Sequence, residues 1–286
     1  MIPVDAYPIK VSVRTHEGRS GKKNEDRYAV AAFKVSEAED TPSVLAVVSD
    51  GIGGHQAGEV AAELAVRMIA ESISESDATA PVETLRAAVI QAGNAIREEA
   101  EAEQGRRGMG STCVCAWIIG DRLFTASVGD SRIYLIRDHK IHQLTTDHTW
   151  VQEAIELGVL TPDQARSHPN THVIRRYLGS RMPVVPDVRL RLEAGETDLE
   201  AEENQGIALK ETDRVLLCTD GLTDLVSDRE ILGAMQTINL DNAVQQLIHL
   251  ANLRGGHDNI TIVALDCGLD GAGSRSSFWK RFSLFG

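Results

Sequence analysis

The sequence predicts a layered α+β fold, and three observations support it. Short runs of apolar and β-branched residues recur along the chain and end in charged or glycine-containing turns, as strands do. Two longer stretches place their apolar residues at the spacing of an amphipathic helix. Strands come in runs and do not alternate singly with helices, which argues against βαβ units. With 286 residues, 42% of them hydrophobic, the chain can bury a large core as one domain.

The first half of the chain predicts strands, a pair of helices and then an antiparallel meander. Val60, Leu64 and Met68 recur at helical spacing, and a similar pattern follows Pro81. Glycine and aspartate turns, such as Gly120-Asp121, separate the strands of the meander. The expected elements are strands over 9–13, 28–35 and 44–49, helices over 56–73 and 85–96, and strands over 112–119, 122–128, 132–137 and 141–144.

The second half predicts a small helical insert and then more strands and helices. A helix is expected over 149–158, and Thr161-Pro162 can begin another because proline fits a first helical turn. The acidic stretch 193–205 lacks periodicity, which predicts a surface loop. The remaining elements are strands over 184–192, 214–218 and 260–266, and helices over 228–235 and 241–253.

Composition excludes several classes of function. A net charge of −13 repels nucleic acid, so we expect no nucleic-acid partner. Cys113, Cys115, Cys218 and Cys267 form no CxxC pair and are expected to be reduced core residues. No apolar run suits a membrane span and no secretory signal is visible, so the expected location is cytoplasmic.

Four aspartates share a structural context. Asp50, Asp130 and Asp220 each follow a predicted strand and precede a glycine or another small residue, whereas Asp258 precedes a strand. Carboxylates at buried strand ends are unstable unless a cation compensates them. Mg²⁺ and Mn²⁺ prefer such oxygen ligands, and two such ions can activate a water for attack on phosphorus. Each Asp-Gly pair taken singly is equally typical of a plain turn.

Taken together and in this order, the motifs resemble the metal-dependent protein phosphatases of type 2C, of the bacterial type. The resemblance spans roughly residues 9 to 266. The helical insert corresponds to the flap that such enzymes carry beside the active site. The matching motifs are Asn24-Glu25-Asp26-Arg27, Asp50-Gly51-Ile52-Gly53-Gly54-His55, Gly110-Ser111-Thr112, Val128-Gly129-Asp130-Ser131-Arg132, Thr146-Asp147-His148, His168-Pro169, Asp220-Gly221-Leu222 and Asp258-Asn259-Ile260-Thr261.

The resemblance implies a four-layer sandwich, in which two antiparallel sheets pack face to face with helices on both outer sides. It also implies a catalytic domain over 1–270, with the flap at about 147–180, that hydrolyses phosphoserine and phosphothreonine on proteins. The expected partners are phosphoproteins of a cognate Ser/Thr kinase, and the expected state is a monomer. Asp224 and Asn259 are expected to orient the loops that hold the site.

The resemblance further implies two Mn²⁺ or Mg²⁺ ions, with a position for a third. The implied catalytic residues are Glu25, Asp50, Asp220 and Asp258. Asp50 would bridge the two metals, the Gly51 carbonyl would bind one, and Asp220 and Asp258 would bind the other. The remaining implied ligands are Glu25 and Asp26, which would act through waters, and Asp130, which with Asp220 would hold the third ion.

Two positions depart from the family pattern. Gly21 stands where relatives place a phosphate-binding arginine, so Lys22 or Arg19, or failing them Arg14, is expected to take that role. Ile52 stands where some relatives carry a proton-donating histidine. A water on the metals, or a flap residue drawn from His148, His168 and His172, would then donate the proton, although each histidine is better explained as structural.

Residues 271–286 predict a linker and an aromatic, basic tail. Phe278, Phe282 and Phe285 would share a face if the segment were helical, with Lys280 and Arg281 able to reach anionic headgroups. The tail would then serve as a peripheral membrane foot or a docking foot for a protein partner. Alternatively, it folds back over an apolar groove of the domain.

Two other functions remain open on the sequence. Gly21 is also compatible with a catalytically weak regulator that keeps the fold and binds phosphoproteins. A phosphatase of an anti-sigma-pathway regulator, or of a small phosphoester, is the other alternative.

Overall fold

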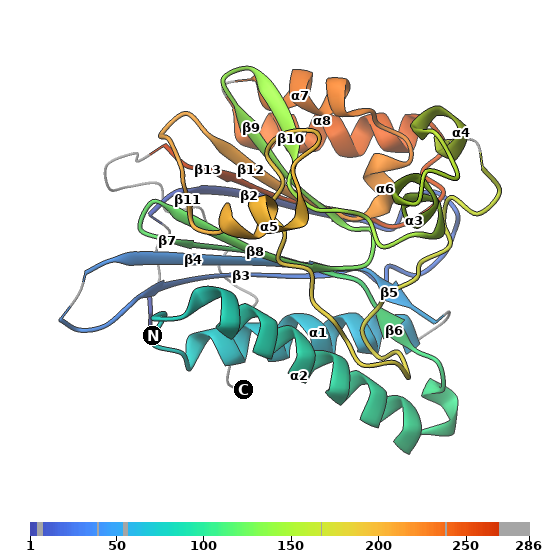
Figure 1. The fold of residues 1–286 in the computed structure, drawn as a ribbon, viewed down its shortest axis with the longest axis horizontal. Helices are drawn as coiled ribbons and strands as arrows, with labels where there is room; N and C mark the ends of the chain where they lie inside the picture. Colours follow the sequence, from blue (N-terminus) through green and yellow to red (C-terminus); the bar gives the residue numbers. More distant parts are fainter. Residues whose placement is uncertain (5–7, 39, 54–56, 167, 238, 269–286) are drawn as a thin grey trace.

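Two antiparallel sheets packed face to face form the centre of the molecule (Figure 1). The structure is a computed structural model that describes residues 1–4, 8–38, 40–53, 57–166, 168–237 and 239–268. The first sheet has the strand order β1 (Ile2–Pro3), β3 (Arg27–Lys34), β4 (Pro42–Ser49), β7 (Cys113–Ile119), β8 (Arg122–Val128) and β11 (Ile207–Ala208). The second has the order β10 (Lys140–Gln143), β9 (Arg132–Arg137), β12 (Arg214–Cys218), β13 (Ile260–Asp266) and β2 (Lys10–His16).

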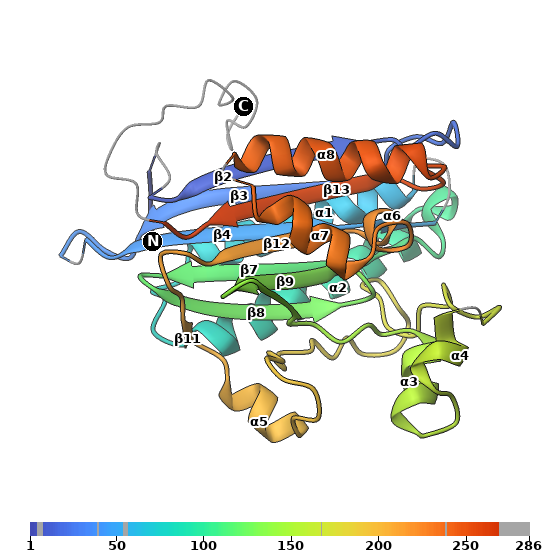
Figure 2. The same ribbon diagram turned by 90° about the horizontal axis from the view of Figure 1, so that it is seen from above.

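Helices cover the outer face of each sheet (Figures 1 and 2). The helices α1 (Ala57–Ser74) and α2 (Pro81–Ala102) lie on the first sheet, and α7 (Asp228–Met235) and α8 (Leu240–Leu253) lie on the second. The central strands are therefore buried on both faces. In β4, Leu45 and Val47 pack under the helices, while Ala46 and Val48 pack between the sheets. This arrangement confirms the predicted four-layer α+β sandwich.

Local signals explain where several helices begin. Pro81 occupies the first turn of α2, where a missing N–H costs nothing. Ser227 and Glu230 form a capping box at the start of α7, whose bounds match the predicted helix. Among the described helices, none combines the length and the apolar character that crossing a bilayer requires.

The predicted strand over 184–192 is wrong. Val188 and Leu190 are buried at alternate positions, which gives the pattern of a strand. However, the backbone bonds to three different partners and to no single neighbouring strand. The Asp187 N–H donates to Ser127 (2.9 Å), that of Leu190 to Ala201 (2.8 Å) and that of Arg191 to Leu144 (3.0 Å). The segment is thus an extended strap across the molecule.

The predicted surface loop over 193–205 is also partly wrong, because it contains the helix α5 (Asp198–Glu203). Thr197 caps the helix and Glu200 reaches back to the Thr197 N–H (2.8 Å), which completes a capping box. Only Ala201 of α5 is buried, so hydrophobic periodicity could not reveal the helix. Thr197 followed three residues later by Glu200 was the sequence signal from which the start of the helix could have been predicted.

The predicted helical insert follows β10 and contains α3 (Trp150–Glu156) and α4 (Pro162–Arg166). Figure 2 shows both helices projecting from one end of the sandwich. Thr149 caps α3 by accepting from the Gln152 N–H (3.3 Å), and His168 stacks on Trp150 with ring centroids 4.7 Å apart.

The tail over 271–286 lies outside the described residues, and the domain boundary at residue 270 stays a prediction.

Candidate metal centre

The predicted carboxylates gather at one end of the sandwich, where strands of both sheets end. Asp50 lies between β4 and the short strand β5 (Gly51–Ile52), which pairs with β6 (Gly110–Ser111). Asp220 opens the short helix α6 (Asp220–Thr223) after β12, and Asp130 lies in the turn between β8 and β9. Figure 1 shows β5, β6 and α6 at the same end of the molecule. The two sheets therefore each supply part of one acidic cluster.

These carboxylates perturb one another strongly. Burial, with Asp26, Asp220, Asp130 and Asp258 nearby, raises the pKa of Asp50 well above its usual range. Burial also raises the pKa of Asp26 to about 7 and that of Asp220 to about 6, against a usual 3.8. The pKa of Asp130 is likewise raised well above its usual range by burial and by Asp220. Burial first, and the neighbouring carboxylates second, thus make the ionised cluster unfavourable, and an added positive charge would compensate it.

Three of the aspartates also carry a buried oxygen without a hydrogen-bond partner among the described residues. These oxygens are Asp26 Oδ1, Asp130 Oδ1 and Asp220 Oδ1. Leaving a buried carboxylate oxygen unpaired costs stability, and the usual compensation is a cation. A set of carboxylate and carbonyl oxygens suits Mg²⁺ or Mn²⁺ and does not suit a metal that prefers sulfur or nitrogen. The residues present therefore fit the implied metals.

Thr112 joins the Asp50 and Asp130 turns. Its hydroxyl accepts from the Asp50 N–H (3.0 Å) and shares a hydrogen bond with the Ser131 hydroxyl (2.7 Å). Gly129, whose φ is +107°, packs so closely that a Cβ there would lie 2.6 Å from Thr112. Thr112 is part of a motif that the sequence singled out, but its bridging role was not predicted.

Two glycine contacts bring the other segments together. Gly51 packs directly against Gly58 of α1, and a Cβ on Gly51 would overlap the Gly58 carbonyl. Gly221 packs in the same way against the Asn259 carbonyl oxygen. Gly221 thus brings Asp220 next to the loop that carries Asp258. The contribution of Gly58 was missed, because the first turn of a helix gave no signal of it.

Asn259 connects the Asp258 loop to the Glu25 segment. Its side-chain oxygen accepts from the Glu25 N–H (2.8 Å), and its amide donates to the Glu17 carbonyl (3.1 Å). These bonds agree with the expectation that Asn259 fixes the loop. Thr219, which the sequence analysis did not single out, donates to Asp26 Oδ2 (3.0 Å) and so holds that carboxylate.

The basic candidates for phosphate binding diverge. Lys22 Nζ lies 3.8 Å from Asp258 Oδ2, so its ammonium faces the cluster. Arg19 donates to the Asn252 carbonyl (3.5 Å) and thus points toward α8, and Arg14 lies 3.8 Å from Asp241 on the same helix. Gly21 is exposed, and a Cβ there would meet no atom within 4 Å. The structure therefore favours Lys22 over the two arginines.

The three flap histidines have different surroundings. His148 is buried, accepts from the Gly129 N–H (3.0 Å) and lies 3.2 Å from Asp187, and His168 stacks on Trp150. Both contacts are structural. His172 lies 3.3 Å from Asp224 Oδ2, and ligand atoms of His172, Asp224 and Asp220 lie within 4.8 Å of one another. His172 is therefore the flap histidine that reaches the cluster.

Asp224 links the flap to the Asp258 loop. Its Oδ2 atom lies 3.3 Å from His172 Nδ1 and also 3.3 Å from His257 Nε2. Its backbone N–H donates to the Asp220 carbonyl (2.9 Å), so it is fixed at the end of α6. This placement agrees with the expected orienting role.

The raised pKa values predict how the metal-free protein responds to pH. Asp26 and Asp220, with pKa values of about 7 and 6, keep protons in the folded state that they lose above pH 4 when unfolded. The resulting stabilisation is fully present below about pH 4 and is lost progressively as pH rises from about 4 to about 7. For Asp26, the difference between 3.8 and about 7 corresponds to at most about 4 kcal/mol.

In EDTA, we therefore expect a melting temperature several degrees higher at pH 5.5 than at pH 8, measured by calorimetry. Asp26→Asn should flatten this dependence because asparagine does not titrate. A melting temperature that stays constant or rises over this interval would contradict the expected pKa shifts.

Comparisons with known proteins agree with this geometry. The family model described as "Protein phosphatase 2C" matches residues 14–253. The serine/threonine protein phosphatase PstP of Mycobacterium tuberculosis is 38% identical over 258 residues, which are 90% of this chain and 45% of that protein. The chain thus spans less than half the length of that relative. The serine/threonine phosphatase stp of Listeria monocytogenes is 33% identical over 271 residues, which are 92% of this chain and 98% of that protein.

Solved structures give the same result. The crystal structure of the M. tuberculosis phosphatase PstP/Ppp superposes with a TM-score of 0.76 at 34% identity, covering 90% of this chain and 98% of that one. The catalytic domain of PstP in complex with two manganese ions superposes with a TM-score of 0.73 at 33% identity, covering 90% and 97%. The sequence, the fold and these relatives together show that the chain belongs to the protein phosphatase 2C family.

Proposed function

We propose that the chain is a metal-dependent phosphatase that removes phosphate from phosphoserine and phosphothreonine on proteins. The observation that carries this proposal is the set of buried, unpartnered oxygens on Asp26, Asp130 and Asp220. A binding module would have no need for a cluster that is so unfavourable without a cation. Family membership and the two-manganese structure of PstP support the same conclusion.

The proposed metal-holding residues follow the sequence analysis. Asp50, the Gly51 carbonyl, Asp220 and Asp258 would together hold the metal pair. Glu25 and Asp26 would hold the waters around the pair, and Asp130 would contribute to a third ion. When bound, a pair of divalent cations lowers the pKa of a water and neutralises the phosphate oxygens.

The other polar groups of the chain would position the substrate and move the proton. Lys22 faces the cluster from the exposed side, where its ammonium can contact a phosphate oxygen of the substrate. His172, next to Asp224, would give a proton to the leaving oxygen of the serine or threonine, since Ile52 cannot donate one. Thr219 and Asn259 hold the Asp26 carboxylate and the Glu25 backbone in place.

The test is phosphate release from a phosphothreonine peptide with Mn²⁺ and with EDTA. We expect turnover with Mn²⁺, loss of turnover in EDTA and recovery when excess Mn²⁺ is restored. Recovery controls for irreversible damage by the chelator. The proposal would be contradicted if turnover were unchanged by EDTA, or if neither Mn²⁺ nor Mg²⁺ gave any turnover. A strong preference for free phosphoserine over the peptide would favour a small phosphoester as substrate.

Gly21 supports a second candidate, a catalytically weak regulator that binds phosphoproteins. Gly21 is exposed and has no side chain that could contact a phosphate, so substrate affinity would depend on neighbouring residues. A regulator of this kind would bind the phosphopeptide in the presence of Mn²⁺ without releasing phosphate. The proposal also includes a cognate Ser/Thr kinase, a monomeric state, a cytoplasmic location and a docking role for the tail. A regulator of an anti-sigma pathway is the alternative protein substrate.

A further inference from the structure

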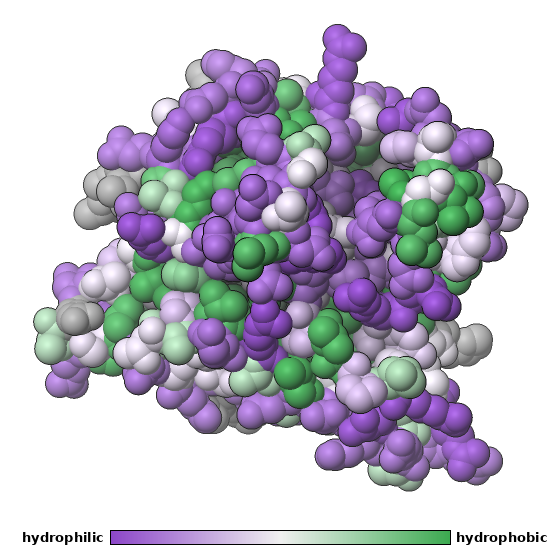
Figure 3. Space-filling model, viewed as in Figure 1, coloured by the Kyte–Doolittle hydropathy of each residue, from purple (hydrophilic) through white to green (hydrophobic). Residues whose placement is uncertain are grey.

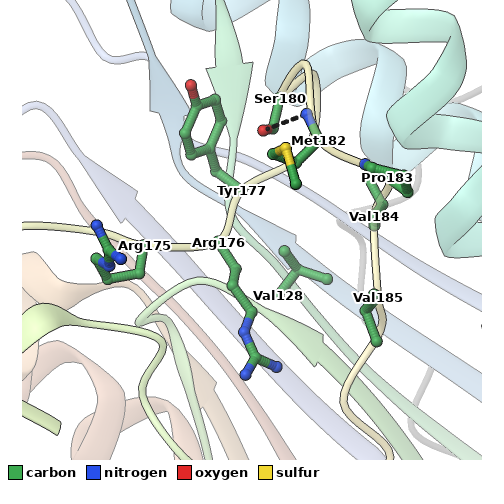
Figure 4. A pocket seen from close by; sticks show the side chains of 9 residues that line it. All are labelled: Val128, Arg175, Arg176, Tyr177, Ser180, Met182, Pro183, Val184 and Val185. Carbon is green, nitrogen blue, oxygen red and sulfur yellow. Dashed lines mark hydrogen bonds between the residues drawn. The ribbon is translucent and has the colours of Figure 1, made fainter. Parts of the chain in front are cut away.

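A pocket of about 310 Å³ is lined by Val128, at the end of β8, and by residues of the long loop that follows α4. Figure 4 shows the side chains around it, most of which come from the loop that follows the insert. The lining residues are Val128, Arg175, Arg176, Tyr177, Ser180, Met182, Pro183, Val184 and Val185. The catalytic proposal gives this pocket no role.

Main-chain hydrogen bonds hold the pocket against the candidate metal centre. Leu178 and Ser111 exchange backbone hydrogen bonds of 2.8 and 3.1 Å, and Ser111 in turn pairs with Gly51. On the other side, the Arg175 N–H donates to the His148 carbonyl (2.7 Å). Val128, which lines the pocket, lies two residues before Asp130. The pocket and the cluster therefore share one rigid frame.

The charge of the pocket is opposite to that of the protein. Arg175 is paired with Glu153 at 3.1 Å. Arg176 is exposed, and within the described part of the chain its guanidinium has no ion pair or hydrogen bond. In a protein of net charge −13, an unneutralised guanidinium at the pocket wall is a site for an anion supplied by a ligand.

The opposite wall of the pocket is apolar and accessible. Met182 is 73% exposed and Val185 is 61% exposed, although both belong to residue types that usually lie inside. Figure 3 shows small hydrophobic patches set among hydrophilic surface on this face of the molecule. Tyr177 packs over Gly110, where a Cβ would come within 2.6 Å of its ring. A cation beside exposed aliphatic groups fits a peptide better than it fits an isolated inorganic anion.

We propose that this pocket binds an anionic side chain of the substrate, a phosphate or a carboxylate, that lies within a few residues of the phosphorylated residue being hydrolysed. Arg176 would contact the anion through its guanidinium fork, and Met182 and Val185 would contact the adjoining peptide. This inference rests on the proposed phosphatase function, and it names the class of peptide that the site takes. Arg176 is then a specificity residue outside the metal centre.

The first experiment compares phosphothreonine peptides that differ only in the flanking anion. Glutamate, or a non-hydrolysable phosphonate analogue of phosphoserine, is placed at one position at a time on either side of the phosphothreonine. We expect one position at which kcat/KM rises, by about 3-fold for glutamate and about 10-fold for the phosphonate, mainly through KM. The effect should shrink at high salt.

Variants at Arg176 then test the contact. Arg176→Ala should remove the preference, and Arg176→Glu should reverse it, while hydrolysis of para-nitrophenyl phosphate stays unchanged. Arg229→Ala is the matched control, because Arg229 is an exposed arginine of α7 on the other helical layer. Equal rates for neutral and acidic peptides in the unmodified protein, or a preference that persists in Arg176→Ala, would overturn the inference.

A binding experiment separates this inference from the proposed catalysis. Calorimetric titration in Mn²⁺ uses the same peptides with a non-hydrolysable phosphonate in place of the central phosphate; it should show tighter binding of the acidic peptide, and Arg176→Ala should abolish the difference. If phosphate release fails for every substrate while this difference is present, the phosphatase proposal fails and the pocket assignment stands. If affinity is the same for neutral and acidic peptides, the pocket assignment fails whatever the turnover.

Discussion

Replacing Asp50 by asparagine is expected to abolish most phosphate release and, at the same time, to make the metal-free protein more stable. Metal ions supply several kcal/mol of transition-state stabilisation, so loss of the proposed bridging ligand should lower Mn²⁺-dependent turnover on the order of 10³-fold. The stability gain has a separate cause. Burial and four neighbouring carboxylates raise the pKa of Asp50, and a neutral asparagine of the same shape removes that repulsion.

Melting curves measured with and without Mn²⁺ at pH 8 distinguish the two effects. In EDTA, Asp50→Asn should unfold at a higher temperature than the unmodified protein, because asparagine carries no charge that burial and the neighbouring carboxylates disfavour. With Mn²⁺, the unmodified protein should gain stability by binding the ion, and the variant should gain much less. Asp121→Asn is the control, because it removes an exposed charge. A variant that loses activity and is also destabilised in EDTA would argue for a structural role of Asp50.

Gly221→Ala is expected to disrupt the site without changing any polar group. The added methyl would overlap the Asn259 carbonyl oxygen, so α6 must move away from the Asp258 loop. Overpacking of this kind costs about 1–3 kcal/mol or more. Because Asp220 opens α6, the shift separates it from Asp258, and a displacement near 1 Å can cost about 10²-fold in rate.

Gly233→Ala provides the matched control for this substitution. Gly233 is an exposed glycine inside α7, and a Cβ there would meet no atom within 4 Å. We expect this variant to keep full activity and to gain about 0.4–1 kcal/mol from the lower backbone entropy of the unfolded chain. Steady-state kinetics and thermal melts of both variants provide the comparison. Full activity in Gly221→Ala would mean that the close contact with Asn259 is not needed to set the Asp220 position.

The sequence predicted the metal-centre candidates because each lies in a local motif beside a strand end. Asp50, Asp130 and Asp220 could be found without knowing which strands pair. The sequence could not predict the residues that join those motifs to one another. Thr219 holds Asp26 across 193 residues of sequence, and Gly58 acts through its close contacts with Gly51 and with the Glu25 side chain. Such roles depend on which distant segments meet, and a small residue carries no local sign of its neighbour.

The errors in the fold have a related origin. In the segment 184–192, Val188 and Leu190 are buried two positions apart, but the backbone bonds to several different elements, so this spacing did not imply a neighbouring strand. The helix α5 is stabilised by its capping box and by ion pairs such as Arg189 to Asp198 (2.9 Å), and almost none of it is buried. Hydrophobic periodicity detects a buried face and not the secondary structure itself. The segment 184–192 has buried residues without forming a strand, and α5 is a helix without a buried face.

The pairing of β2 with β13 has a consequence for how the protein is made. Register pairs such as Val13 with Val263 join strands about 250 residues apart, and β2 is the edge strand of its sheet. During synthesis, β2 leaves the ribosome early and has no strand to pair with until β13 is complete. The first sheet lacks only β11 once β8 is made, whereas the second sheet needs almost the whole chain. Because Asp220 follows β12 and Asp258 precedes β13 of that late sheet, a nascent chain cannot hold the complete proposed metal centre until translation has passed residue 258.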